Sequence, residues 1–271
     1  MSLSPAAAAF DAVAERFDAR YGAWKSVAAQ RRAVRAALIA AFPPGARILE
    51  IGGGTGDDAE WLARQGRQVL LTDVSPSMVR LATDKLRGLG LPTPLVAPAE
   101  QLEAIGGDVR GPFDGAFSNF AALNCVTDLV AVGRALSVLV RPGGRVLLVI
   151  FGVCTPGEWI VELLRGNPRA MLRRASRGDV SARLGGCAFA VRYHRERDLV
   201  VAMAPAFRLV RRIGIGVFVP PSAAEPWISA HPGLLRVLER LDRIVSRPLA
   251  SLADHVLYEF ERTALVPERA G

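Results

Sequence analysis

Between residues 46 and 151, short apolar runs alternate with stretches whose apolar residues recur at helical spacing. The apolar runs that predict strands cover 46–52, 68–74, 94–97, 113–119 and 145–151, and the stretches that predict helices cover 57–65, 77–86 and 129–140. Strands that alternate with helices indicate parallel βαβ units in an open sheet with helices on both faces. Ligands of such sheets bind at the carboxyl ends of the strands.

The flanking segments complete this plan. Phe10, Val13 and Phe17 recur at helical spacing, so the first forty residues predict helices. After residue 151 we expect an insertion over 156–190, in which residues 157–177 form a basic amphipathic helix or helix pair. A helix over 195–204, a strand over 207–218 and a helix over 233–245 should follow. Residues 255–262 predict a final strand, which we place at an edge of the sheet. The fold class is therefore α/β: a Rossmann-like sheet of seven strands, mostly parallel with an antiparallel last strand.

A glycine-rich loop follows the first strand. Residues 50–56 read Glu-Ile-Gly-Gly-Gly-Thr-Gly, and a helix comes next. Glycines let the backbone turn sharply and approach a ligand, and the start of the helix offers unpaired N–H groups. A dinucleotide fingerprint would place Asp57 where its third glycine is needed, against a pyrophosphate, which argues against NAD or FAD. The loop also lacks the lysine of a P-loop, which excludes ATP hydrolysis of that type.

The pattern E-x-G-x-G-x-G resembles motif I of the class I S-adenosylmethionine (SAM) dependent methyltransferases. Asp73 ends the second strand about twenty residues later, where that family has an acid that binds the ribose hydroxyls. Residues 113–119 resemble the family's fourth strand, and 141–145, Arg-Pro-Gly-Gly-Arg, resemble the turn before its fifth. The resemblance covers about residues 46–150. It implies a methyltransferase of EC 2.1.1 type, with SAM as cofactor and S-adenosylhomocysteine as product.

The resemblance also implies a set of cofactor contacts. These are Glu50, Gly52, Gly53, Gly54, Gly56, Asp73, Val74, Met78, Ala99, Glu100, Ser118 and Asn119. One departure from the family occurs after the third strand, where Pro98 stands near the place of an acid that contacts the adenine amine. We expect that contact from the backbone N–H of Ala99 or from Glu100.

The resemblance divides the chain into four parts of one globular domain. Residues 1–44 form an N-terminal helical lid, 45–151 the SAM-binding core, 152–253 the completion of the core with acceptor-pocket insertions, and 254–271 the last strand and tail. The candidate substrate contacts are Tyr21 and Trp24 in the lid, Asn124 in the core and Tyr193 in the part 152–253. Packing explains Tyr21 and Trp24 equally well, and hydrogen bonds to the loop backbone explain Asn124 equally well.

Methyl transfer is an in-line displacement that requires no metal, so the enzyme mainly aligns the reactants. An oxygen acceptor benefits from a general base, and histidine suits that role at neutral pH. His194, which falls just before the helix after the insertion, is the candidate catalytic base, with a locally bonded strand-end histidine as the alternative. His255 follows Asp254 at the start of the last strand, and we expect a structural cap there.

The net charge of +8 is concentrated in one region. Twelve arginines and four acidic residues lie between 160 and 215, which accounts for the whole excess. The exocyclic-amine motif of nucleic-acid methyltransferases is absent, because residues 118–121 read Ser-Asn-Phe-Ala. Cys125 and Cys154 are roughly placed for cytosine C5 chemistry, but neither follows a proline. We therefore expect no nucleic-acid partner. The basic segment has three open explanations, namely an acidic carrier protein, anionic lipid at a peripheral membrane contact, or a solvated helix face.

The favoured function is transfer of a methyl group to oxygen of a small, largely apolar acceptor, as in the secondary metabolism of polyketide, aromatic or isoprenoid compounds. Methylation at nitrogen or carbon, a carrier-bound substrate, and a SAM-binding protein without methyl transfer stay open. The three cysteines, of which Cys187 is the third, are too far apart for a disulfide framework or a clustered metal site, and no signal peptide or membrane span is evident. These features favour the cytoplasm. The oligomeric state is not determined by the sequence.

Overall fold

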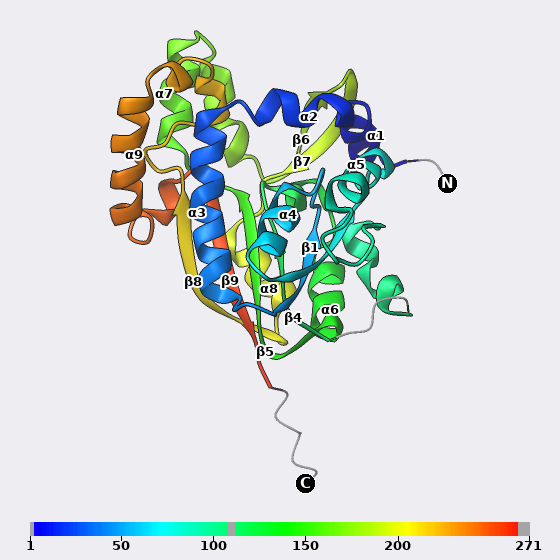
Figure 1. Cartoon of the computed structure of the whole chain (residues 1–271). Coiled ribbons are helices and arrows are strands. Elements are labelled where there is room, and N and C mark those ends of the chain that lie inside the picture. The colour runs from blue at the N-terminus through cyan, green and yellow to red at the C-terminus, as the bar shows by residue number, and fades with distance from the viewer. Residues whose placement is uncertain (1–2, 108–111, 265–271) are drawn as a thin grey trace.

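The structure is a computed structural model that describes residues 3–107 and 112–264. Its main sheet has the order β3-β2-β1-β4-β5-β9-β8 (Figure 1). The strands are β1 (Arg47–Ile51), β2 (Gln68–Asp73), β3 (Leu95–Val96), β4 (Phe113–Ser118), β5 (Val140–Phe151), β8 (Phe207–Ile215) and β9 (His255–Arg262). β1 pairs in parallel with both β2 and β4, so the order of the strands reverses at β1. The predicted Rossmann-like sheet is confirmed.

The position of the last strand differs from the prediction. β9 is antiparallel to β5 on one side and to β8 on the other, so the expectation that it lies at an edge is wrong. The physical reason is burial, because all six residues from His255 to Phe260 are buried. A strand that is buried along its length on both faces occupies the interior of a sheet.

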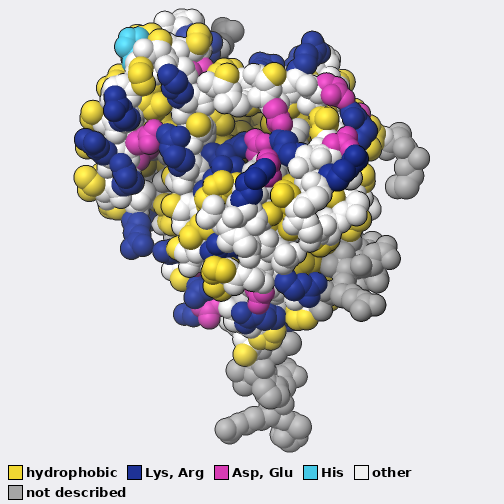
Figure 2. Space-filling view, viewed as in Figure 1, with side chains coloured by type: hydrophobic (Ala, Val, Ile, Leu, Met, Phe, Trp, Pro, Cys, Tyr) yellow, Lys and Arg dark blue, Asp and Glu magenta, His cyan; other side chains and the backbone are white. Residues whose placement is uncertain are grey.

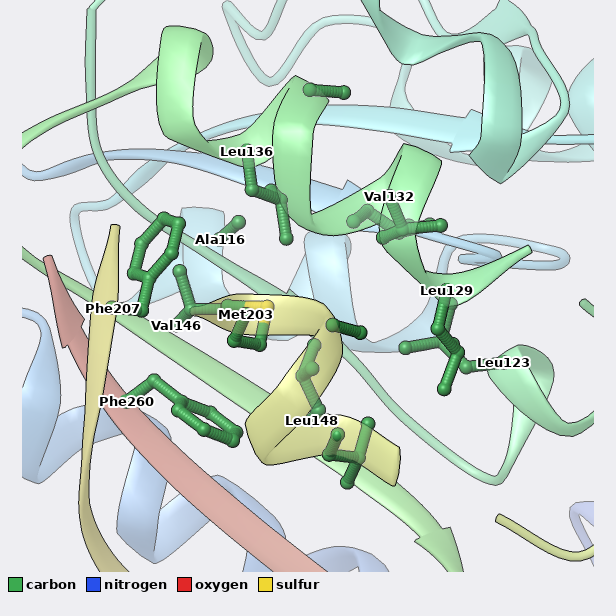
Figure 3. Packing of buried hydrophobic residues seen from close by; sticks show 14 of the residues in the cluster. Ala116, Leu123, Leu129, Val132, Leu136, Val146, Leu148, Met203, Phe207 and Phe260 are labelled. Atoms are coloured by element: carbon green, nitrogen blue, oxygen red, sulfur yellow. The ribbon is translucent and has the colours of Figure 1, made fainter. Parts of the chain in front are cut away.

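Helices cover both faces of the sheet. They are α1 (Pro5–Asp11), α2 (Ala14–Tyr21), α3 (Lys25–Ala41), α4 (Asp57–Arg64), α5 (Pro76–Leu86), α6 (Leu129–Leu139), α7 (Pro156–Leu164), α8 (Glu196–Met203) and α9 (Pro232–Val245). Apolar residues of α6 and α8 pack on β4, β5 and β9, and Figure 3 shows Val132, Leu136 and Met203 meeting Val146 and Phe260 there. Apolar residues of α3, α4 and α5 pack on the opposite face.

The insertion is only partly helical. α7 and a 3-10 segment (Pro168–Ala175) are followed by a hairpin of β6 (Asp179–Leu184) and β7 (Cys187–Arg192), which forms a separate sheet. The helix pair expected over 157–177 corresponds to α7 and this 3-10 segment, whereas the hairpin that follows was not predicted. Gly185 and Gly186, both at positive φ, form the two-residue turn, and exposure alternates along the strands. A Gly-Gly pair between alternating runs is a hairpin signal. The hairpin packs against α1 at one end of the molecule (Figure 1).

Several arginines of the basic segment 160–215 form ion pairs with acidic residues that lie outside this segment. Arg211 and Arg208 of β8 pair with Glu259 and Glu261 of β9, at 2.5 and 3.2 Å. Arg174 forms an ion pair of 2.8 Å with Asp254. These acids lie outside the window 160–215, so the local count of charges overstates how basic this surface is.

Candidate active site

The glycine loop lies at the carboxyl end of β1. The N–H groups of Gly52 and Gly53 both donate to the carbonyl of Thr72, at 2.8 and 3.1 Å, which fixes the loop on β2. Gly52 has a φ of +67°, and a Cβ atom there would lie 2.4 Å from the Cβ of Ala122. A side chain at position 52 would therefore strain the backbone and collide with the loop after β4. Gly54, at φ +57°, faces open space, and Gly56 is the N-cap residue of α4.

Asp73 ends β2 directly beside this loop. Its Oδ2 accepts a hydrogen bond from Gly54 N and its Oδ1 accepts one from Ser75 N, both at 2.9 Å. Burial raises the pKa of Asp73 above its usual range, against the lowering effect of these bonds. Each carboxylate oxygen has more than one lone pair, so both can accept a further hydrogen bond from a ligand hydroxyl.

Glu50 is a buried acid at the end of β1. Its Oε2 is fully enclosed and has no hydrogen-bond partner among the residues that the structure describes. Burial raises the pKa of Glu50 well above its usual range, and Asp58 adds to that increase whereas Arg31 opposes it. An orphaned buried carboxyl is costly unless a ligand pairs with it. Glu50 and Asp73 therefore fit a cofactor that carries positive charge and vicinal hydroxyls, as SAM does.

The comparisons with known proteins agree with this site. Residues 48–144 match the family described as "Methyltransferase domain". Residues 48–144 of the chain form a methyltransferase domain. SAM is the cofactor of this domain type.

Two curated relatives match the methyltransferase domain and its surroundings. A ubiquinone biosynthesis O-methyltransferase of Xanthomonas oryzae pv. oryzae is 35% identical over 128 residues, which is 44% of this chain and 52% of that protein. A ubiquinone/menaquinone biosynthesis C-methyltransferase of Ralstonia pickettii is 30% identical over 161 residues, covering 54% and 59%. The chain thus spans about half the length of the curated relatives it matches.

Solved structures share the fold over most of the chain. A SAM-dependent methyltransferase from Mesorhizobium loti has a TM-score of 0.52 at 20% identity, covering 84% of this chain and 96% of that one. The [4+2]-cyclase SpnF has a TM-score of 0.54 at 15% identity, covering 85% and 80%. The same architecture therefore occurs in proteins named for different reactions.

The other residues expected to contact the cofactor surround the glycine loop of the methyltransferase domain. Met78 is 1% exposed on α5, and its N–H donates to Ser75 Oγ at 3.1 Å. Val74 is half-buried after β2. Ser118 ends β4 with a buried Oγ that has no partner among the described residues.

Two of the three remaining expected contacts, Asn119 and Glu100, have hydrogen-bond partners within the chain. Asn119 donates from Nδ2 to Oδ2 of Asp58 at 2.7 Å. Ala99 and Glu100 begin the 3-10 segment after β3 (Ala99–Gly107), and Glu100 Oε1 accepts a bond of 3.4 Å from Thr127 N. The adenine contact expected from these two residues stays a prediction.

The N-terminal helices are bonded to the cofactor side of the domain. Asp11, at the end of α1, accepts hydrogen bonds of 2.8 Å from Ser75 Oγ and Ser77 N. Asp18 of α2 pairs with Lys85 of α5 at 2.7 Å and accepts a hydrogen bond from Thr55 in the glycine loop. Lys85 also pairs with Asp57, and acidic and basic side chains lie intermixed in the middle of this face (Figure 2).

Tyr21 and Trp24 belong to an aromatic group at the end of α2. The two rings are perpendicular, with centroids 5.0 Å apart, and Phe17 lies 4.7 Å from Tyr21. Phe10 of α1 joins the group through Phe17 and contacts Phe189 of β7 at 5.7 Å. The structure therefore brings both lid candidates into an apolar cluster between α2 and α3.

Two expected acceptor-side residues face backbone groups. His194 is buried, and its Nε2 lies 3.1 Å from the carbonyl oxygen of Val126. Burial lowers the pKa of His194 below its usual value. Asn124 donates from Nδ2 to Arg192 O at 2.6 Å and accepts from Phe151 N at 3.0 Å, so both ends of its amide hold the backbone.

His255 begins β9 among aromatic side chains and beside Asp254. Its ring lies 4.9 Å from that of Phe151 at the end of β5 and 6.0 Å from that of Phe120 after β4, measured between centroids. Nδ1 is enclosed and lies 3.2 Å from Oδ2 of Asp254, although the geometry of this contact is not that of a hydrogen bond. Nε2 has no hydrogen-bond partner in the described part of the chain. The Asp-His pair was visible in the sequence, but its place beside β5 depends on strand pairing.

A buried ion network supports this pair. Arg174 donates from Nη2 to Oδ1 of Asp254 at 2.8 Å and pairs through Nε with Oε2 of Glu158 at 2.5 Å. Burial acts to raise the pKa of Asp254, but His255 and Arg174 lower it below its usual range. The ring centroid of Tyr193, a candidate substrate contact, lies 5.8 Å from that of Phe151, and burial raises the pKa of Tyr193.

A cavity of about 690 Å³ lies between α3, β8 and α9.

Proposed function

We propose that this chain is a SAM-dependent methyltransferase that moves a methyl group to oxygen of a small, largely apolar acceptor. One observation carries the proposal: the glycine loop and the Asp254–His255 pair meet at the same edge of the sheet. The loop after β4 joins them, because Ala122 packs on Gly52 while Phe120 contacts His255. The name of the Xanthomonas relative, an O-methyltransferase, supports the choice of oxygen.

The cofactor would be held by residues of the glycine-loop side. Asp73 would accept hydrogen bonds from the ribose hydroxyls, and the unpartnered Oε2 of Glu50 would face the positively charged methionine part. Open space at Gly54 leaves room for a ligand against the backbone. SAM, when bound, supplies an electrophilic methyl group and leaves as S-adenosylhomocysteine.

His255 is the proposed general base. Asp254 would hold the ring proton on Nδ1, which leaves the lone pair of Nε2 to accept the proton of an acceptor hydroxyl. Asp254 also stabilises the imidazolium that results. This arrangement favours His255 over His194, whose Nε2 contacts a backbone carbonyl.

The acceptor pocket would be apolar. Phe120 and Phe151 contact the ring of His255, and Tyr193 contacts Phe151. The aromatic group of Tyr21 and Trp24 lies on the N-terminal helices. We propose that these helices form the lid, because Asp11 and Asp18 attach them to the cofactor side. A natural-product acceptor and a carrier-bound form of it both fit an apolar pocket.

The first test is calorimetric titration of the purified protein with SAM, S-adenosylhomocysteine and NAD. We expect micromolar binding of the first two and none of the third. Binding of NAD, or no binding of either adenosyl compound, would contradict the cofactor assignment.

The second test is a screen of phenols, catechols and hydroxylated quinones, in which mass spectrometry locates the added methyl group. With an active probe, His255→Gln should lower turnover by about 10²–10⁴-fold while the affinity for SAM is kept. His231→Gln is the matched control, since His231 lies exposed before α9. Full activity of His255→Gln would reject His255 as the base. A loss of turnover in His194→Ala that is absent in His255→Gln would assign the role to His194 instead.

Two alternatives have their own outcomes in this screen. Methylation of carbon or nitrogen, as the name of the Ralstonia relative indicates for carbon, would place the label on those atoms. Tight SAM binding without S-adenosylhomocysteine formation from any probe would favour a protein that uses the fold for another purpose. The structural likeness to a [4+2]-cyclase is the observation that keeps this second alternative open.

A further inference from the structure

The outer side of α9 carries an aliphatic stripe that no part of the described chain covers. Leu234, Val237, Leu241 and Ile244 are 42, 50, 40 and 75% exposed, whereas Leu235 on the inner side is 3% exposed. At helical spacing the four exposed residues fall within roughly 80° of arc and extend about 15 Å along the axis. The stripe is therefore a continuous apolar strip rather than scattered surface residues.

Four arginines form a second stripe beside the first. Arg236, Arg240, Arg243 and Arg247 are exposed, and none forms an ion pair with the described residues. At helical spacing they cluster roughly 110° round the helix from the aliphatic stripe. Figure 2 shows basic side chains gathered on the flank where Figure 1 places α9.

The acids of α9 are used inside the protein. Glu239 pairs with Arg32 of α3 at 2.6 Å. Asp242 accepts hydrogen bonds from Phe218 N at 2.6 Å and Val219 N at 3.2 Å. The outward face of the helix is therefore both apolar and positively charged, with no acid to balance its arginines.

We infer that α9 docks this protein on an anionic membrane surface, with the aliphatic stripe among the acyl chains and the arginines at the headgroups. An exposed helix that carries Leu, Val and Ile beside unpaired arginines has the composition of helices that lie in a membrane interface. Long arginine stems reach headgroups while their apolar neighbours insert. Trp227, 56% exposed just before the helix, is the aromatic type found at such interfaces. No helix of the described residues is long and apolar enough to cross a membrane, so the docking is peripheral.

Lipid fits this surface better than an acidic protein partner does, because an acyl layer takes up the aliphatic stripe while the anionic headgroups pair with the arginines beside it. Anionic lipid was one of three explanations that the sequence left open for the basic residues of 160–215, and α9 lies outside that segment. Several arginines of that segment pair internally, Arg208 and Arg211 with β9 among them.

The test is flotation of the full chain with vesicles of phosphatidylcholine alone and of phosphatidylcholine with about a quarter phosphatidylglycerol. We expect binding to the anionic vesicles only, weakening as salt is added. Leu241→Glu with Ile244→Glu should lower the bound fraction at least about tenfold, and Arg236→Gln with Arg240→Gln should lower it severalfold. Val138→Glu, at an equally exposed aliphatic residue on α6, is the matched control and should bind like the unchanged protein.

Several outcomes would overturn the inference. No flotation with anionic vesicles rejects it, and flotation that survives the Leu241/Ile244 change moves lipid binding elsewhere. Sedimentation without vesicles tests the rival occupants: a dimer that Leu241→Glu dissociates would assign the stripe to a second copy of the chain. Purified acyl carrier protein is the probe for an acidic protein partner. If it binds the unchanged chain but not the Leu241→Glu variant, and no flotation occurs, the stripe would be assigned to an acidic protein. SAM titration of each variant keeps these results separate from the proposed methyl transfer.

Discussion

The N–H of Gly54 donates to Oδ2 of Asp73 at 2.9 Å, which couples the loop after β1 to the end of β2. Asp73 thereby shapes the loop and, in the proposed function, binds the cofactor ribose. Removal of the Asp73 side chain should therefore disturb both the loop and ribose binding. Removal of an exposed acid on the neighbouring helix α5 should disturb neither the loop nor ribose binding.

Asp73→Ala should weaken SAM binding at least about tenfold, because two hydrogen bonds to a charged acceptor are lost. Calorimetric titration measures the change. Asp84→Ala, on the exposed face of α5, is the control and should bind SAM normally. Unchanged affinity in Asp73→Ala would refute the ribose assignment.

The affinity for SAM should increase as pH rises from the usual pKa of a glutamic acid to the raised pKa of Glu50. Burial keeps the pKa of free Glu50 well above that value, so the carboxyl is protonated over the interval up to its raised pKa. A cation binds the ionised form better, so binding releases a proton and strengthens as pH increases. The stability of the free protein changes in the opposite direction. Because the folded state holds the Glu50 proton more tightly than the unfolded state does, the contribution of Glu50 to the free energy of unfolding falls as pH rises through the same interval.

Glu50→Gln should remove this pH dependence of binding, measured by titration at several pH values. Glu103→Gln, at an exposed acid, is the control and should retain it. A pH-independent affinity in the unchanged protein would argue that Glu50 does not face the cofactor charge.

Loosening α2 should speed cofactor release. Asp18→Asn removes the ion pair with Lys85 and weakens the contact with Thr55, so we expect a severalfold faster dissociation of SAM and faster hydrogen exchange over residues 5–22. Glu15→Gln, whose partner is Arg80, is the matched control on the same helix. Equal dissociation rates in both variants would mean that α2 does not act as a lid.

Arg174→Met should destabilise the protein by up to about 3–5 kcal/mol, because Glu158 and Asp254 would lose the buried guanidinium that they share. Glu158 would keep Arg173, and Asp254 would keep His255 and Gln30. Urea unfolding measures the change. Arg197→Met, at an exposed arginine of α8, should be nearly neutral. A small loss in Arg174→Met would show that water reaches the network and replaces the guanidinium.

The core of the site could be predicted from the sequence because its signals are local. Residues 50–56 combine strand, glycine turn and helix start within a few positions, and Asp73 follows at the end of the next apolar run. Backbone geometry at Gly52 and Gly54 and the pairing of β1 with β2 then follow directly. The hairpin turn at Gly185 and Gly186 was equally local and could have been recognised.

The sequence by itself determined the alternating sheet, the glycine loop and the acids beside it, since each depends on residues that are neighbours along the chain. Only the tertiary structure decided that β9 lies between β5 and β8, which brings His255 to Phe151 and gives the arginines of β8 their partners Glu259 and Glu261. It also decided that the acids of α9 turn inward and leave the arginines outside. The physical reason is that pairing between distant segments depends on the burial and charge of the whole assembly, which no short window of sequence contains.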